Sequence, residues 1–322
     1  MADSTKLVIT IDTEEDNWGM YHPTGHSVEN LGKIPFLQDL FDEFRMAPTY
    51  LITYPVATDD GSVAMLKCIL DAGRCEIGMH CHPWNTPPFE EELNETNSML
   101  CNLPLDLQYE KMKELHDVIK RNFHVEPKTF RAGRWGYDRG VAQNLQKLGY
   151  RVDTSVMPFT DWSSQQGPDF SRVFPRPFKY LSDDFRQEAT DGCLIEVPAT
   201  VGYLQNNFDL CNRMWELAGR GRLRNLRLRS ILGRLNLLNK VYLSPEASDS
   251  RNMINLAEVM MKQGCGIMNL FFHSTSLKAG LSPFVKTEDE EKRFLGRIRN
   301  FLAFARSAGI EGIKLSDTIH IV

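Results

Sequence analysis

The chain has 322 residues, enough for a large hydrophobic core, and because α/β barrels of this size are often one domain we expect a single domain over residues 1–322. Its formal net charge of −5 gives no overall attraction for nucleic acid, whose binding domains are usually basic. Seven cysteines without the spacing of a disulfide framework, an N-terminus unlike a secretory signal, and no apolar run of the roughly 18 to 20 residues that span a bilayer favour a cytoplasmic protein.

Short β-rich runs alternate with helical patterns along most of the chain. The expected order is strand 7–11, helix 34–44, strand 49–54, helix 63–70, strand 75–80, helix 108–123, strand 129–131, helix 141–148, strand 150–155, strand 194–198, helix 252–262, strand 266–273 and helix 290–308. About seven parallel strands with helices outside them predict a distorted parallel (β/α)7-type barrel. An open doubly wound sheet is the alternative, because the order of the elements does not prove closure.

Two stretches interrupt this alternation. Residues 158–191 are rich in Pro, Ser, Asp and Gln, so we expect loops and short strands there. The stretch that begins at Arg213 and ends at Lys240 carries eight basic residues and one acidic residue. Its apolar residues at 228, 231, 232, 235 and 238 fall on one helical face, which predicts a basic amphipathic helix in an insertion at about residues 205–250.

That basic insertion has two interpretations. It is either a solvated structural helix or a surface for an anionic partner, namely phospholipid headgroups or an acidic or pyrophosphate-linked glycan. Contact with phospholipid would place the protein peripherally at the inner membrane face.

Residues 75–84, with the sequence CEIGMHCHPW, deliver two histidines at the end of an expected strand. Pro83 disfavours helical backbone at the residue before it, so His82 is expected to be extended. Residues two apart in an extended chain face the same way, which allows His80 and His82 to share one metal ion. The alternative is a pair of ordinary polar residues at a strand end.

Residues capable of chemistry also follow or end the other expected strands. They are Asp12 and Glu14, then Arg131 with Arg134 and Trp135, then Asp153 and Ser155, then Glu196, and finally His273. Barrel enzymes place their chemistry at the carboxyl ends of the strands, so these positions predict one active site.

Five separated segments, in order, resemble the motifs of the polysaccharide deacetylases, the NodB-like group of carbohydrate esterase family 4. The segments are residues 10–14, residues 76–80, residues 130–136, Asp153 to Ser155 with Asp161 and Trp162, and residues 270–273. The resemblance covers nearly the whole chain and is to a branch with Asp-x-Glu and His-x-His motifs linked to surface-glycan biosynthesis. It implies the NodB homology fold and a metal-dependent N-deacetylase that hydrolyses the acetamide of an N-acetylated sugar in a polysaccharide, core-glycan or lipid-linked glycan.

The resemblance also implies roles for individual residues. Asp12 is the general base, Arg131 orients it, and His273 is the general acid. Asp153 is expected to steer His273, because a charged imidazole benefits from a carboxylate neighbour.

The metal ligands implied are Glu14, His80 and His82, with Glu15 or Asp16 as alternative carboxylates. Such a set suits Zn²⁺ first, while iron, cobalt and nickel stay open. We expect Arg134, Trp135, Trp162 and Glu196 to contact the substrate, although the two tryptophans also suit a core.

Two positions depart from the usual family pattern. The family spaces its metal histidines four apart, whereas residue 84 here is Trp, and Thr13 stands where a second aspartate is usual. Two other functions therefore stay open: an amidohydrolase acting on a small non-sugar amide, and an inactive glycan-binding protein.

Overall fold

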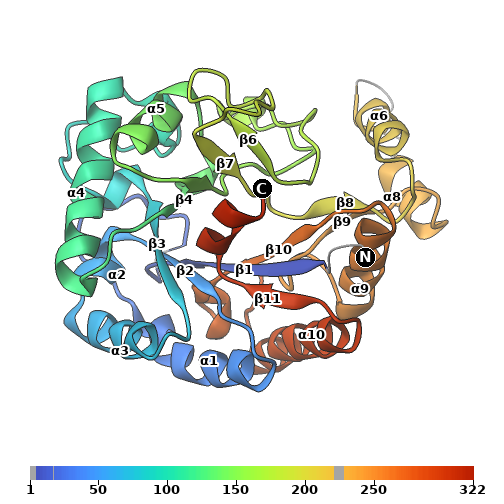
Figure 1. Ribbon diagram of the computed structural model, residues 1–322, viewed down its shortest axis with the longest axis horizontal. Coiled ribbons are helices and arrows are strands. Elements are labelled where there is room, and N and C mark those ends of the chain that lie inside the picture. The colour runs from blue at the N-terminus through green and yellow to red at the C-terminus, as the bar shows by residue number, and fades with distance from the viewer. Residues whose placement is uncertain (1–4, 17, 221–227) are drawn as a thin grey trace.

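The computed structural model describes residues 5–16, 18–220 and 228–322. Over these residues a mostly parallel sheet curls into a half-barrel with helices around it (Figure 1). The strand order is β10 (Ile267–His273), β1 (Lys6–Thr13), β2 (Thr49–Ile52), β3 (Glu76–Cys81), β4 (Thr129–Ala132), β5 (Val152–Asp153), β7 (Leu194–Glu196) and β6 (Phe178–Tyr180). Neighbours from β10 to β7 pair in parallel, β6 is antiparallel to β7, and β11 (Glu311–Ile313) pairs in parallel with β1. The predicted distorted parallel barrel is confirmed.

The side of the barrel between β7 and β10 is bridged by irregular backbone. The N–H of Thr200 donates to the carbonyl of Asn269 in β10 at 3.2 Å. Leu243 donates to Thr200 at 2.8 Å and accepts from Phe271 at 3.1 Å. The backbone after β7 therefore curls round toward β10, at the other end of the strand order. The open doubly wound sheet that was the alternative lacks such a connection.

Six helices lie close to where their apolar periodicity placed them: α1 (Ile34–Glu43), α3 (Asp60–Asp71), α4 (Leu105–Phe123), α5 (Arg139–Lys147), α9 (Ser250–Lys262) and α10 (Glu288–Ser307). The short helix α2 (Tyr54–Thr58) was not expected. Asp59, Asp138, Asp249 and Thr287 cap α3, α5, α9 and α10 by accepting a hydrogen bond from the first turn. The expected strand 49–54 is too long: β2 ends at Ile52, and α2 begins at Tyr54 with Pro55 in its first turn.

Short 3₁₀ helices connect several of these elements. They are η1 (Glu29–Lys33), η2 (Pro83–Asn85), η3 (Leu100–Asn102), η4 (Gly133–Trp135), η5 (Ser163–Gln165), η6 (Ser274–Leu277) and η7 (Leu315–His320). As expected, residues 158–191 form loops with only η5 and β6 within them.

Buried apolar side chains form a separate cluster on each face of the sheet. Inside, Val8, Val152, Ile195, Val197, Ile267 and Leu315 form one buried cluster. A larger cluster packs the outer face of the sheet against the helices. Because parallel partners in register share a face, the pairs His80 with Arg131 and Asp12 with His273 each point to the same side of the sheet.

The basic insertion differs from the single helix expected. Between β8 (Val201–Tyr203) and β9 (Lys240–Tyr242), which pair antiparallel, lie α6 (Phe208–Ala218) and α8 (Leu228–Arg234). The helix α8 ends at Arg234, and Asn236 takes a left-handed φ of 54° that cannot continue a helix, so Leu235 and Leu238 fall beyond it. Arg222, Arg224 and Arg227 lie outside the described residues. Figure 1 shows α6 and α8 projecting to one side of the barrel.

No helix within the described parts of the chain combines the length and apolar character needed to cross a bilayer.

Candidate active site

A cavity of about 510 Å³ opens at the carboxyl ends of the strands. Nine of the residues singled out from the sequence line it: Asp12, Glu14, His80, His82, Arg131, Arg134, Trp135, Trp162 and His273. Asp153 and Glu196, which were also expected there, are not among its lining residues.

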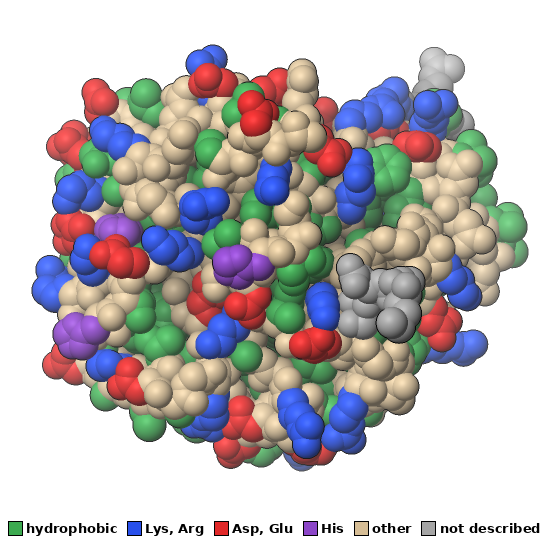
Figure 2. All heavy atoms as spheres, viewed as in Figure 1, with side chains coloured by type: hydrophobic (Ala, Val, Ile, Leu, Met, Phe, Trp, Pro, Cys, Tyr) green, Lys and Arg blue, Asp and Glu red, His purple; other side chains and the backbone are tan. Residues whose placement is uncertain are grey.

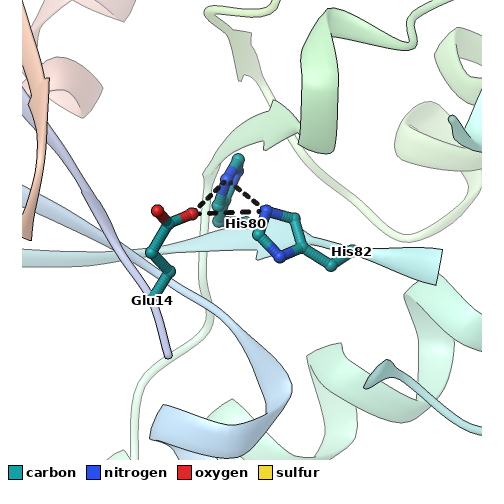
Figure 3. A group of neighbouring side chains, drawn as sticks. All are labelled: Glu14, His80 and His82. Carbon is teal, nitrogen blue, oxygen red and sulfur yellow. Dashed lines mark hydrogen bonds and ion pairs between the residues drawn. The ribbon is translucent and has the colours of Figure 1, made fainter. Parts of the chain in front are cut away.

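Three side chains meet at the floor of the cavity (Figure 3). Glu14 follows β1, His80 lies in β3, and His82 follows β3. The two Nε2 atoms are 2.9 Å apart, and Oε2 of Glu14 lies 3.5 Å from Nε2 of His82 and 3.9 Å from Nε2 of His80. His82 has the extended backbone that Pro83 predicted, with φ −99° and ψ 119°.

The outer nitrogens of both histidines already have partners. Nδ1 of His80 lies 3.0 Å from the carbonyl oxygen of Arg131, to which it must donate. Nδ1 of His82 lies 3.3 Å from Oε1 of Glu15. With a proton on each Nδ1, both Nε2 atoms present a lone pair toward Glu14.

The two alternative carboxylate ligands are engaged elsewhere. Glu15 contacts the outer nitrogen of His82, opposite the three-residue cluster. Asp16 accepts hydrogen bonds from Ser27, Asn30 and the backbone N–H of Glu29, which holds the loop after β1. Glu14 is therefore the carboxylate placed to join the histidines.

The donor set of the cluster fits a divalent cation. Burial lowers the pKa of His80 to about 3, so this imidazole is neutral and its Nε2 lone pair is free. Burial, with the nearby carboxylates of Glu15, Asp12 and Glu246, raises the pKa of Glu14 well above its usual range. Burial thus disfavours the charged form of a carboxylate that meets two imidazole nitrogens, and a bound cation would neutralise that charge.

Gly133 makes room for one of these ligands. A Cβ at this position would lie 2.5 Å from Cδ2 of His82 and 2.8 Å from the carbonyl oxygen of Cys81. Only glycine lets the backbone after β4 pass so close to the imidazole. On the side chain's other flank, His82 stacks on Trp84 with ring centroids 4.0 Å apart.

Asp12 and Arg131 form a buried ion pair beside the cluster. Nη1 of Arg131 lies 2.6 Å from Oδ1 of Asp12, Nε donates to the carbonyl of Thr154, and Nη2 donates to the hydroxyls of Thr10 and Thr154. Burial raises the pKa of Asp12, but Arg131, His80 and His273 outweigh it and lower the value to about 2. Asp12 is therefore ionised, and its hydrogen bond to Arg131 holds one of its two oxygens in place.

His273 faces Asp12 across the floor, with Nε2 3.5 Å from Oδ2. Its partner is Glu246, not the predicted Asp153: Oε2 of Glu246 lies 2.9 Å from Nδ1, and Oε1 accepts the backbone N–H of His273 at 3.1 Å. Burial lowers the pKa of His273, but Glu246 and Glu14 more than offset it and raise the value to about 10. Glu246 lies in the loop after β9, and nothing in its spacing marked it in the sequence.

Asp153 fails to reach His273 because strand alternation turns it outward. Its neighbour Val152 points into the barrel, so Asp153 points to the outer face, where it pairs in register with Glu196. Both are fully buried, and burial raises both pKa values. Glu196, expected to contact substrate, therefore forms a carboxyl pair with Asp153 away from the cavity.

Aromatic side chains form the cavity walls. Trp18 packs edge-on against His273 at 4.7 Å, Phe284 stacks on His273 at 6.3 Å, and Trp18 and Phe284 also contact each other at 5.5 Å. Trp135 lies 5.3 Å from the guanidinium of Arg131, and Trp162 also lines the cavity. Trp18, Trp84, Tyr242 and Phe284 also line the cavity but were not expected there, because an isolated aromatic residue carries no signal in the sequence of where it points.

Arg134 ties together the loops around the cavity. Its guanidinium donates to the Tyr21 hydroxyl at 2.7 Å, the Ser98 hydroxyl at 2.6 Å and Oε1 of Gln165 at 3.0 Å. These three partners come from three separate loops, so Arg134 holds the rim as well as lining the cavity.

Comparisons with known proteins bear on the fold. No protein-family model matches the sequence, and the comparison with curated proteins found no match. Among solved structures, the chain is similar to a protein from Mycobacterium smegmatis assigned as a polysaccharide deacetylase, with 15% identity, a TM-score of 0.55, and coverage of 100% of this chain and 91% of that one.

Two further structures have the same fold. A Parabacteroides distasonis protein assigned as a glycoside hydrolase or deacetylase matches with 11% identity and a TM-score of 0.59, over 99% of this chain and 71% of that one. The allantoinase PuuE matches with 11% identity and a TM-score of 0.55, over 99% of this chain and 90% of that one. The chain thus has the NodB-like fold of the polysaccharide deacetylases.

Proposed function

We propose that this protein is a metal-dependent N-deacetylase that hydrolyses the acetamide of an N-acetylated sugar and releases acetate. The observation that carries the proposal is the cavity floor, where an ionised Asp12 and a protonated His273 flank the cluster of Glu14, His80 and His82. Amide hydrolysis needs a base for the attacking water, an acid for the departing amine and a positive charge that polarises the carbonyl. This arrangement supplies a candidate for the first two, and a cation held by the cluster would supply the third.

Two residues of the chain each carry out one proton transfer. Asp12, held by Arg131, accepts at Oδ2 a proton from the attacking water. His273 donates from Nε2 to the departing amine nitrogen, while Glu246 on Nδ1 stabilises the charged imidazole. The rim aromatics Trp18 and Phe284 shield this exchange from bulk water.

Glu14, His80 and His82 would hold the cation, which in such sites polarises a carbonyl oxygen and acidifies water. Two imidazole nitrogens and one carboxylate oxygen form the ligand set of catalytic zinc sites, so Zn²⁺ is our first candidate. The orientation of both Nε2 atoms toward Glu14 favours this over a glycan-binding protein that has lost its metal.

The cavity supports a sugar as the substrate. Its volume of about 510 Å³ falls in the range of small-molecule sites, and tryptophans line its walls. Flat aromatic faces suit the apolar face of a pyranose ring. The fold likeness to an allantoinase keeps a small non-sugar amide as the second candidate.

Acetate release from metal-replete protein tests the proposal. We expect hydrolysis of N-acetylglucosamine oligomers, with kcat at least about a hundredfold lower in Asp12→Asn and in His273→Ala. His116→Gln, at a buried histidine outside the cavity, is the control and should keep full activity. Activity on allantoin and related amides but not on acetylated sugars would assign the second function, and full acetate release by both site variants would overturn the mechanism.

A further inference from the structure

The insertion between β8 and β9 has apolar side chains on its outer surface. Leu210, Met214 and Leu217 recur along α6 at spacings of four and three residues, and all are exposed. The opposite face of the same helix packs inward through Phe208, Cys211 and Ala218. A helix on a globular protein normally turns a polar face outward, but the second apolar face of α6 has no packing partner among the residues that the structure describes.

The following segment extends this apolar surface. Ile231 in α8 and Leu235 and Leu237 after it are also exposed, and α8 has no buried residue. Together with those on α6, these side chains are between 38% and 61% exposed. We call these six residues and the exposed arginines among them, Arg213, Arg220, Arg229 and Arg234, the insertion surface.

The insertion surface is positively charged in a chain whose net charge is −5. It carries four exposed arginines, and Glu216 is the one acidic residue in the sequence from residue 213 to residue 240. Figure 2 shows Lys and Arg side chains next to hydrophobic ones over the part of the molecule where α6 and α8 project in Figure 1. The combination of leucine and arginine on one projecting surface limits what can cover it.

We propose that the insertion surface docks on an anionic phospholipid bilayer. Arginines bind headgroup phosphates, while leucine and isoleucine side chains enter the boundary between headgroups and acyl chains. A polyanion such as nucleic acid would satisfy the arginines and leave the leucines in water. A second copy of the chain, placed by twofold symmetry, would bring the arginines of both surfaces together and repel them.

The insertion surface is followed in the sequence by a strand that reaches the cavity. The insertion returns to the barrel through β9, whose last residue, Tyr242, lines the cavity. Lys240 at the start of β9 is anchored to the carbonyl of Phe159 at 2.7 Å. The inference concerns lipid binding and does not depend on the reaction catalysed.

Vesicle sedimentation tests the proposal directly. Full-length protein should bind vesicles of phosphatidylcholine with about 30% phosphatidylglycerol, and bind pure phosphatidylcholine about tenfold more weakly. Leu210→Gln/Leu217→Gln and Arg213→Glu/Arg234→Glu should each lose about tenfold or more of the binding. The residues changed are exposed, so both variants should keep the wild-type circular dichroism spectrum.

Matched substitutions elsewhere are the controls. Phe36→Gln/Leu181→Gln removes two exposed apolar side chains, and Lys292→Glu/Arg293→Glu changes the net charge equally on α10. Both should bind as the wild type does. The proposal is overturned if the protein ignores lipid composition, if the insertion variants bind unchanged, or if light scattering shows a dimer that Leu210→Gln/Leu217→Gln dissociates.

Discussion

Glu246 is the residue that most changes the chemistry expected from the sequence. Both of its carboxylate oxygens are committed: Oε2 to Nδ1 of His273, and Oε1 to the backbone of His273 and the hydroxyl of Ser276. A carboxylate held in this way fixes the tautomer and orientation of the imidazole and favours its charged form. We therefore propose Glu246 as the positioning residue for His273, the proposed general acid.

Replacing Glu246 with Gln should move the alkaline limb of the pH–activity profile. The pKa of His273 is raised to about 10, and removing the Glu246 charge lowers it, so the protonated acid is lost at lower pH. We expect the limb of kcat to shift toward neutral pH by about one unit or more, with kcat at least about tenfold lower.

Ser276→Ala is the matched control, because this hydroxyl donates to Glu246 without touching His273. Its alkaline limb should stay close to that of the wild type. If Glu246→Gln keeps the wild-type limb, Glu246 has only a structural role.

At the scale of the element, strand alternation separates the residues that meet from those that do not. Arg131 and His80 are register partners on the inner face, while Asp153 pairs with Phe130 on the outer face. The sequence placed Asp153 correctly at a strand end, but a two-residue strand is too short for its alternation to be read from composition. The pairing of β5 with β4 decides which way the Asp153 side chain points, and this pairing joins segments that are distant in the sequence.

The Asp153–Glu196 pair predicts a pH dependence of stability. Oδ2 of Asp153 and Oε2 of Glu196 have no donor among the described residues, and one shared proton would satisfy both. Burial raises both pKa values above those of the unfolded chain, so the folded state binds more protons. The free energy of unfolding is therefore highest below the unfolded pKa values and falls as the pH rises toward the folded ones.

Glu196→Gln should reduce this fall, because the amide donates to Asp153 without titrating. Each unit of raised pKa costs about 1.4 kcal/mol at high pH, so the variant should lose less stability than the wild type between pH 5 and pH 8. Urea unfolding across this range measures it, with the exposed Glu258→Gln as control. Parallel curves for Glu196→Gln and wild type would rule out a shared proton.

Site residues that lie in loops were harder to predict from the sequence than those next to a strand. His82 was predictable because Pro83 acts on the residue next to it, and backbone restriction by a neighbour is local. Glu246, Trp18 and Phe284 approach His273 from three segments far apart in the chain. The sequence of each of those segments gives no sign that it lies near His273 in the fold, so these residues were missed.

At the scale of the whole molecule, the alternation of strands and helices predicted the fold. Every strand from β1 to β5, and also β7 and β10, overlaps a run expected from the sequence. Closure was not predictable, because it depends on irregular backbone such as Thr200 and Leu243 bridging toward β10. The insertion was recognised by its charge, while the end of α8 at Arg234 was not.

Metal binding should stabilise the entire fold, because Glu14, His80 and His82 come from β1 and β3 and their loops. A ligand at a hundred times its Kd adds about 2.7 kcal/mol to the free energy of unfolding. We expect Zn²⁺ to raise the Tm of chelator-treated protein by a few degrees. His82→Ala should lose that rise and retain less metal by elemental analysis, whereas His116→Gln should keep both.

An unchanged Tm on adding Zn²⁺, or an equal rise in His82→Ala, would show that the metal is held elsewhere. The proposed metal site would then be wrong even if the protein hydrolyses amides.

The contact between Gly133 and His82 has a consequence for descent. A Cβ at position 133 would lie 2.5 Å from the imidazole and 2.8 Å from the carbonyl oxygen of Cys81, so a side chain and the backbone both exclude it. Losing the second histidine alone would therefore not free the position 51 residues later. Among relatives, we expect this glycine to vary less than the histidine whose ring it accommodates.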